Sequence, residues 1–276
     1  SLLYWGALAL VLLVQRRREA ARDTLQGAFA TLARTKGLAV GERVEAVAPD
    51  LASASRDLVL RAAADHDVDR AAFEVLAAFL RDRWGPDALV RDGSAHRSRR
   101  ERWRRITALR ILTRLQHPHA INLLARALDD ADDEVSEEAL ALLGRCLDPR
   151  AMDLLIDALR ARRHPASRVA VYIDRSPQEI GPRLATLLSD ANADVRQWAA
   201  AFVERYPDPA YEAQLIALTA DEEPRVRKAA IQTLGMVGSD AAVEPALHRL
   251  TDPVPYVRAH AARALGRLGV TDGAER

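Results

Sequence analysis

Hydrophobic and polar positions repeat at a constant spacing in the carboxy-terminal half of the chain. Each copy of the pattern starts with an aspartate, continues with a Val-Arg pair five and six positions later, and ends in an alanine-rich stretch. Three copies align without gaps at Asp190, Asp221 and Asp252, so the spacing is the same both times. A repeat of this length predicts similar helical units that bury their hydrophobic faces only against one another.

The hydrophobic residues inside one copy are spaced as on one face of a helix. In the second copy this stripe consists of Val226, Ala229, Ala230, Leu234 and Val237. Two glycines near the end of the stripe are expected to end this helix before a second one begins. They are Gly235 and Gly238 in the second copy, and Gly266 and Gly269 in the third.

Weaker copies of the same pattern occur upstream. Val135 follows an aspartate at the usual distance, but Ser136 stands where other copies have arginine, and Trp103 occupies the valine position one repeat earlier. The segment that separates Val135 from Val195 is long enough for two units, one of them degenerate with a shortened first helix. We therefore expect about six units over residues 97–276, with the last one cut after its first helix.

Residues 19–96 lack this repeat and are expected to form a helical connector or cap. The pattern predicts a helix over Glu19 to Arg34, a loop or short extended piece over residues 36–50, a helical hairpin over residues 51–64 and 68–84, and a linker over residues 85–98.

The amino terminus is a hydrophobic run that ends at a basic edge. Residues 2–14 carry no charge, and residues 16–18 are three arginines. As a helix this run is only about 20 Å long, whereas the hydrocarbon core of a bilayer is about 30 Å thick. The hydrocarbon part of the arginine side chains can lengthen the segment that lies in the membrane. Tyr4 and Trp5 are typical of a membrane interface. We predict a membrane-anchor helix over residues 1–18, which makes the chain a single-pass protein of the inner membrane with its repeats in the cytoplasm; a core helix is the alternative.

Composition and charge add few constraints. The 276 residues are 49% hydrophobic and 5% aromatic, and 40 basic side chains stand against 39 acidic ones. Strong helix formers predominate, which favours an all-α protein, and the near-zero net charge gives no global field that would attract nucleic acid. The single cysteine, Cys146, excludes an intramolecular disulfide and a zinc site built from thiolate pairs.

A basic cluster is the most conspicuous polar feature. It comprises Arg97, Arg99, Arg100, Arg102, Arg104, Arg105, Arg110 and Arg114. A helix with these arginines could follow phosphates while Trp103 stacks on a base. Seven acids between Asp129 and Glu138 would lie beside it in a stack of repeats, so mutual neutralisation is the preferred interpretation and nucleic acid is disfavoured as a partner. If the cluster binds a ligand, the binding residues are Arg97, Arg99, Arg100, Trp103 and Arg104.

Other residues with chemical potential form no recognisable catalytic or metal site. His117 and His119 flank a proline at a turn without an accompanying carboxylate or thiolate pattern. Cys146 follows a helix end and is expected to be a buried thiol, and His260 falls in a helix-packing position. The motifs of serine hydrolases, phosphate-binding loops and zinc proteases are missing from the sequence. We therefore predict that the chain is not an enzyme and holds no metal or cofactor.

The sequence of aspartate, Val-Arg pair, alanine-rich helix and Leu-Gly resembles HEAT repeats over residues 97–276, in particular the short HEAT-like type also seen in phycobilisome lyases. The resemblance implies an α-solenoid, a right-handed α-α superhelix, here preceded by an apolar amino-terminal helix as in bacterial membrane-anchored HEAT-repeat proteins. It also implies that the aspartate at the turn and the arginine that follows it form a structural ladder between successive units. Ser136 interrupts this ladder because it replaces the arginine of its unit. The ladder residues are Asp190, Arg196, Asp221, Arg227, Asp252 and Arg258.

The resemblance is specific for fold and much less so for function. Because solenoids offer extended surfaces, we predict a membrane-anchored scaffold or adaptor that binds a protein partner through its solenoid surface. One alternative is a nucleic-acid-binding HEAT-like module that uses the helix from Arg97 to Arg114. A second alternative is a HEAT-like enzyme, either a bilin lyase or a DNA glycosylase.

Overall fold

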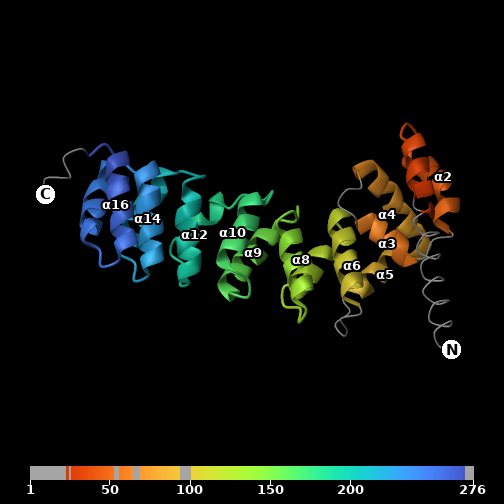
Figure 1. The fold of residues 1–276 in the computed structure, drawn as a ribbon, viewed down its shortest axis with the longest axis horizontal. Helices are drawn as coiled ribbons and strands as arrows, with labels where there is room; N and C mark the ends of the chain where they lie inside the picture. Colours follow the sequence, from red (N-terminus) through yellow and green to blue (C-terminus); the bar gives the residue numbers. More distant parts are fainter. Residues whose placement is uncertain (1–22, 25, 53–55, 65–68, 94–100, 271–276) are drawn as a thin grey trace, which may run out of the picture. The chain divides into compact units, whose positions relative to one another are not determined.

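The structure is a computed structural model that describes residues 23–24, 26–52, 56–64, 69–93 and 101–270. All regular elements within these ranges are helical, with no strand among them, in agreement with the all-α prediction (Figure 1). Contacts divide the chain into two units, one up to Leu142 and one from Leu143 onward. The domain limits expected at residues 18 and 96 stay predictions.

The first unit consists of helices from residue 26 onward. They are residues 26–34, α2 (Val40–Ala52), α3 (Arg56–Ala64), α4 (Arg70–Trp84), α5 (Pro86–Gly93), α6 (Arg102–Arg114), α7 (Ala120–Ala127) and α8 (Asp133–Leu143), whose last residue belongs to the second unit.

Two of these helices correct the sequence prediction. Residues 40–52 form α2 where a loop or extended piece was expected, and residues 86–93 form α5 where a linker was expected. In α2, Val47 and Leu51 lie one turn apart and are at most 1% exposed, on a helix that packs against α4. Burial of this kind outweighs the weak local preference of a segment that contains glycine and proline.

From α10 onward, the second unit alternates long helices with short ones. Its elements are α9 (Arg150–Ala161), α10 (Ala166–Arg175), η2 (Gly181–Arg183), α11 (Leu184–Leu187), α12 (Ala193–Val203), η3 (Pro209–Tyr211), α13 (Glu212–Leu218), α14 (Pro224–Val237), η4 (Asp240–Ala242), α15 (Val243–His248), η5 (Arg249–Thr251) and α16 (Pro255–Arg267). From α10 to α15 each long helix is followed by a 3-10 turn and a short helix, which is the two-helix unit that the repeat predicted.

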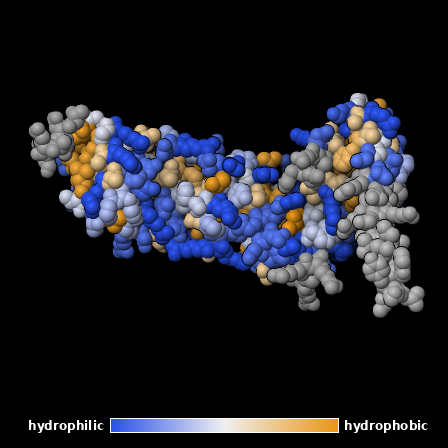
Figure 2. Space-filling model, viewed as in Figure 1, coloured by the Kyte–Doolittle hydropathy of each residue, from blue (hydrophilic) through white to orange (hydrophobic). Residues whose placement is uncertain are grey.

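The buried positions of the second unit recur with the same spacing as the sequence repeat. α14 packs between α12 and α16, and equivalent positions of the three helices are buried. These positions are Val195, Ala199 and Val203 in α12, Val226, Ala230 and Leu234 in α14, and Val257, Ala261 and Leu265 in α16. Val237, also expected on the buried stripe, is the last residue of α14 and is 37% exposed. On the face drawn in Figure 2, hydrophobic side chains form small patches among hydrophilic ones.

The predicted membrane anchor and apolar amino-terminal helix, residues 1–18, lie outside the described residues. In the part of the chain that the structure describes, no helix combines the length and hydrophobicity that crossing a bilayer requires. The prediction of a single-pass inner-membrane protein is therefore corrected, because the described residues supply no membrane-spanning helix.

Candidate functional site

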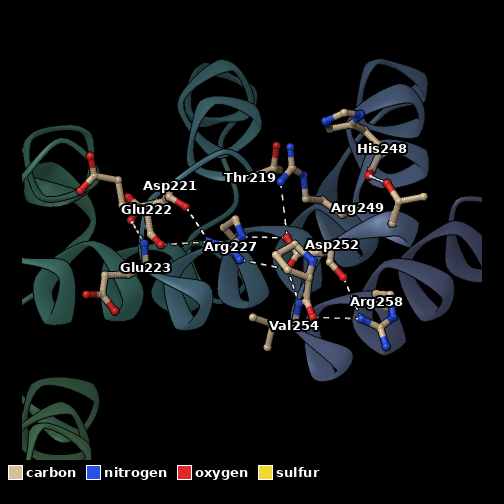
Figure 3. A network of polar contacts seen from close by, with 12 residues as sticks. Thr219, Asp221, Glu222, Glu223, Arg227, His248, Arg249, Asp252, Val254 and Arg258 are labelled. Carbon is tan, nitrogen blue, oxygen red and sulfur yellow. Dashed lines mark hydrogen bonds and ion pairs between the residues drawn. The ribbon is translucent and has the colours of Figure 1, made fainter.

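Paired aspartates and arginines join consecutive repeats of the second unit (Figure 3). Arg196 of α12 donates to both carboxylate oxygens of Asp221, with Nε–Oδ2 at 2.7 Å and Nη2–Oδ1 at 2.9 Å. Arg227 of α14 donates to Asp252 in the same way, at 2.8 and 2.9 Å. The remaining nitrogen of Arg227, Nη1, donates to the carbonyl oxygen of Asp221 at 2.9 Å. Each of these arginines therefore ties its own turn to the turn of the next unit.

The two ends of the ladder differ from its middle. Asp190 accepts from Arg160 of α9, at 2.6 Å from Nη2, while its carbonyl oxygen accepts from Arg196 at 2.8 Å. Arg258 donates through Nη1 to the carbonyl oxygens of Asp252 and Pro253, at 2.8 and 3.2 Å. Within the described ranges, no carboxylate forms an ion pair with Arg258.

Asp252 is the most completely buried acid of the ladder. Asp252 is 3% exposed, and its Oδ1 also accepts a hydrogen bond from the backbone N–H of Val254 at 2.9 Å. The hydrogen bond from Arg227 is the main reason that the pKa of Asp252 falls to about 2, and burial opposes this effect. We propose a structural role for the ladder, since all of its charged groups except Arg258 are paired with charged side chains of the protein.

The basic cluster of the first unit is largely paired with acids in the described part of the chain. Arg97, Arg99 and Arg100 lie outside the described residues. Arg110 of α6 donates to both carboxylate oxygens of Glu138 at 2.7 Å. Two further ion pairs join Arg105 to Asp130 and Arg102 to Glu134.

Trp103 is half-buried beneath two guanidinium groups of the same unit. Arg61 lies over its ring at 4.5 Å from the centroid and Arg104 at 5.6 Å, and Arg104 Nη2 is 3.8 Å from a carboxylate oxygen of Asp57. A nucleic-acid base would have to displace Arg61 to stack on the indole. Arg97, Arg99, Arg100, Trp103 and Arg104 remain the residues that a nucleic-acid-binding alternative would use.

We expect the chain not to bind DNA at about 0.15 M salt, because the paired arginines are not available to phosphates. Titration of labelled duplex and single-stranded DNA at two salt concentrations measures this. As a control, the double substitution of Glu134→Gln and Glu138→Gln removes two of the negative charges that face Arg102 and Arg110 and should raise the affinity at low salt. Sub-micromolar affinity of the unsubstituted chain at about 0.15 M salt would contradict this expectation.

The remaining candidate residues are Cys146, the pair His117 and His119, and His260. Burial raises the pKa of the Cys146 thiol, and the residue is 7% exposed. The rings of His117 and His119 are 5.4 Å apart, and the described residues contain no group of three side chains that could hold a metal ion. His260 Nδ1 lies 2.7 Å from the carbonyl oxygen of Tyr256, one turn earlier in α16.

An open groove of about 540 Å³ lies between α10 and α12. Its hydrophobic part is formed by Ala170, Val171, Trp198, Ala201 and Phe202. Its charged rim is formed by Asp174, Arg175, Glu204 and Arg205. Sequence reasoning did not identify this groove.

Departures from the repeat pattern produce the groove. Val171 in α10 is 44% exposed, whereas the equivalent outward position of α14 holds the polar Gln232. Trp198 in α12 occupies the position of Ala229 in α14. Because an indole between two helices prevents the close approach that alanine permits, α10 and α12 contact each other less extensively than α12 and α14 do. The sequence signal is therefore a pair of large hydrophobic residues at positions where the other units have small or polar ones.

An ion pair crosses the groove at its rim. Arg205, two residues after the end of α12, donates to the carboxylate and, at 3.3 Å, to the carbonyl oxygen of Asp174 in α10. Arg175 and Glu204, which stand next to this pair on opposite walls, are both exposed. Neither of them forms an ion pair with a described residue. The groove thus combines a hydrophobic floor with one cation and one anion that the described residues leave without an ion-pair partner.

Comparisons with known proteins concern the repeats. A family model described as HEAT repeats matches residues 94–172 and 181–266. No curated protein matches the chain. Similar solved structures include human deoxyhypusine hydroxylase in complex with glycerol, with 19% identity, 77% of this chain and 95% of that chain covered, and a TM-score of 0.32. They also include an engineered protein, with 19% identity, 88% and 96% coverage, and a TM-score of 0.27.

These comparisons correct the prediction that the chain is not an enzyme. The solved structures to which it is similar include an enzyme, deoxyhypusine hydroxylase. A likeness at this TM-score assigns no reaction to the chain. The finer resemblance to bacterial membrane-anchored proteins and to phycobilisome lyases has no support in the comparisons.

Proposed function

The chain belongs to the family of HEAT-repeat proteins, and from this premise we propose that it is a scaffold that binds a protein partner in the groove between α10 and α12. Stacked helical repeats provide extended surfaces on which partners bind. The observation that carries the proposal is the hydrophobic floor of the groove, in which Val171 is exposed and Trp198 is half-buried, at positions where neighbouring units have small or polar residues.

The composition of the groove supports a protein partner. Tryptophan and arginine are the residues that most often dominate binding at protein interfaces, and both occur here. A hydrophobic centre with a charged rim is also the usual arrangement of such interfaces, since the rim keeps the free surface in water. The ladder supports the same role, because it holds α12 and the helices that follow it in fixed register.

Val171→Asp is expected to weaken binding of a hydrophobic helical peptide by about tenfold or more, because the substitution removes a hydrophobic contact and places a carboxylate that must be desolvated beneath the peptide. The probe is a fluorescein-labelled synthetic helix of about 14 residues with a leucine stripe, measured by anisotropy with the full chain. Val171 is 44% exposed, so the variant should keep its thermal stability.

Gln232→Asp is the matched control, because it introduces the same charge at the equivalent outward position of α14. It should leave peptide affinity within about twofold of the unsubstituted chain. Equal affinities of the peptide for both variants and for the unsubstituted chain would refute binding in this groove.

A further inference from the structure

The walls of the groove differ in charge. Asp174 and Arg205 neutralise each other across the rim, which leaves Arg175 on the α10 wall and Glu204 on the α12 wall. Both side chains are exposed, and neither forms an ion pair within the described part of the chain. A partner that enters the groove therefore meets a cation on one side of its hydrophobic contact and an anion on the other.

The walls also favour a particular secondary structure in the partner. α10 and α12 have 10 and 11 residues, so each rises about 15 Å, the length of about three helical turns. Their backbone groups are paired within the helices, so an extended peptide finds no strand edge to pair with. A helix satisfies its own backbone and presents only side chains, with hydrophobic anchors at positions i, i+3 or i+4, and i+7.

We propose that the groove binds an amphipathic helix of a partner protein, whose hydrophobic stripe is flanked by an acidic residue on one side and a basic residue on the other. This proposal rests on the proposed function. The acidic flank pairs with Arg175 and the basic flank with Glu204, while the stripe covers Val171 and Trp198. Reversing a helix exchanges its flanks, so the unlike rim charges also determine the direction in which the helix lies.

Three synthetic peptides of about 14 residues test this proposal. They share one leucine stripe and differ only in their flanks, which are Glu and Lys, Glu and Glu, or Lys and Lys. Their affinities for the full chain are measured by fluorescence anisotropy at about 0.05 M and about 0.5 M salt. The mixed peptide is expected to bind about threefold more tightly than either of the others at low salt, and this preference should fade at high salt.

Charge reversal on one wall should change which peptide binds best. Arg175→Glu makes both walls negative and is expected to favour the Lys and Lys peptide. Glu204→Lys makes both walls positive and is expected to favour the Glu and Glu peptide. The neutral variants Arg175→Gln and Glu204→Gln should weaken the preference without reversing it. All four substitutions are at exposed positions, and thermal unfolding verifies that each variant is folded.

Failure of this proposal differs from failure of the proposed function. If the three peptides bind equally, or if charge reversal leaves their order unchanged, while Val171→Asp still weakens binding, the groove binds hydrophobic segments but does not select their flanks. Tighter binding of a proline-rich peptide than of the helices would overturn the choice of a helical partner. Binding that is insensitive to Val171→Asp, or no binding of any probe, would overturn both proposals.

Discussion

Replacing Arg227 with alanine is expected to lower the free energy of unfolding by about 3 to 5 kcal/mol, the usual cost of removing one partner from a buried ion pair. Arg227 and Asp252 are 7% and 3% exposed, and two hydrogen bonds join their side chains. Without the guanidinium, the carboxylate keeps a weaker contact with Arg249 at 3.4 Å. The carbonyl oxygen of Asp221 would also lose its donor.

Arg258→Ala is the matched control for this effect. Arg258 donates to carbonyl oxygens of its own turn as Arg227 does, but it is exposed and has no ion-pair partner among the described residues. Its replacement should cost about 1 kcal/mol or less. Urea unfolding followed by circular dichroism measures both values, and amide exchange in α14 and α16 localises the loss. Equal destabilisation by the two substitutions would show that the ion pair between Arg227 and Asp252 contributes little to the free energy of unfolding.

The contribution of this ion pair should depend on pH in a defined direction. The pKa of Asp252 is lowered from 3.8 to about 2 in the folded chain, chiefly by its hydrogen bond with Arg227. A carboxyl with a depressed pKa stabilises the fold above its unfolded pKa, and this stabilisation is lost as the pH falls toward the folded value. The difference in stability between the unsubstituted chain and Arg227→Ala should therefore shrink as the pH falls from about 4 to about 2.

The periodic spacing of hydrophobic residues predicted those helices in which equivalent positions are buried in each repeat. Val226 and Leu234 were expected on a buried stripe because hydrophobic positions recur there at helical spacing, and both side chains are fully buried. The same reasoning failed for α2, because Val47 and Leu51 become hydrophobic contacts only when α4 lies beside them. A helix that depends on tertiary packing has little signal in its own sequence.

Sequence reasoning missed the candidate groove for a related reason. Val171 and Trp198 are ordinary helix residues until the fold places α10 beside α12 and leaves both on the same groove. Asp194 is a similar case, because its buried carboxylate accepts Arg162 at 2.5 Å and Arg225 at 2.7 Å, from turns on either side of it in the chain. Such contacts depend on the separation between helices, which the repeat length does not specify.

Of the glycines expected to end helices, Gly238 and Gly269 follow the ends of α14 and α16 as predicted, but Gly235 and Gly266 lie inside these helices. Gly235 is in α14, and Gly266 is at the corresponding position of the next unit, in α16. A Cβ atom at Gly235 would lie 2.6 Å from the Cα and 2.7 Å from the Cβ of Ala264 in α16. A Cβ atom at Gly266 would meet no described atom within 4 Å. Gly235 is therefore required by the close approach of two helices, whereas Gly266 is not.

Alanine at these two positions is expected to change stability in opposite directions. Gly235→Ala should lower the free energy of unfolding by about 1 to 3 kcal/mol, because the backbone of Ala264 can yield only if α14 and α16 separate. Gly266→Ala should raise it by about 0.5 to 1 kcal/mol, since alanine is the better helix former and enters open space. Urea unfolding of the two variants beside the unsubstituted chain measures both signs. A stabilising Gly235→Ala would mean that helix propensity outweighs the steric contact, and that the two helices are not held at this distance.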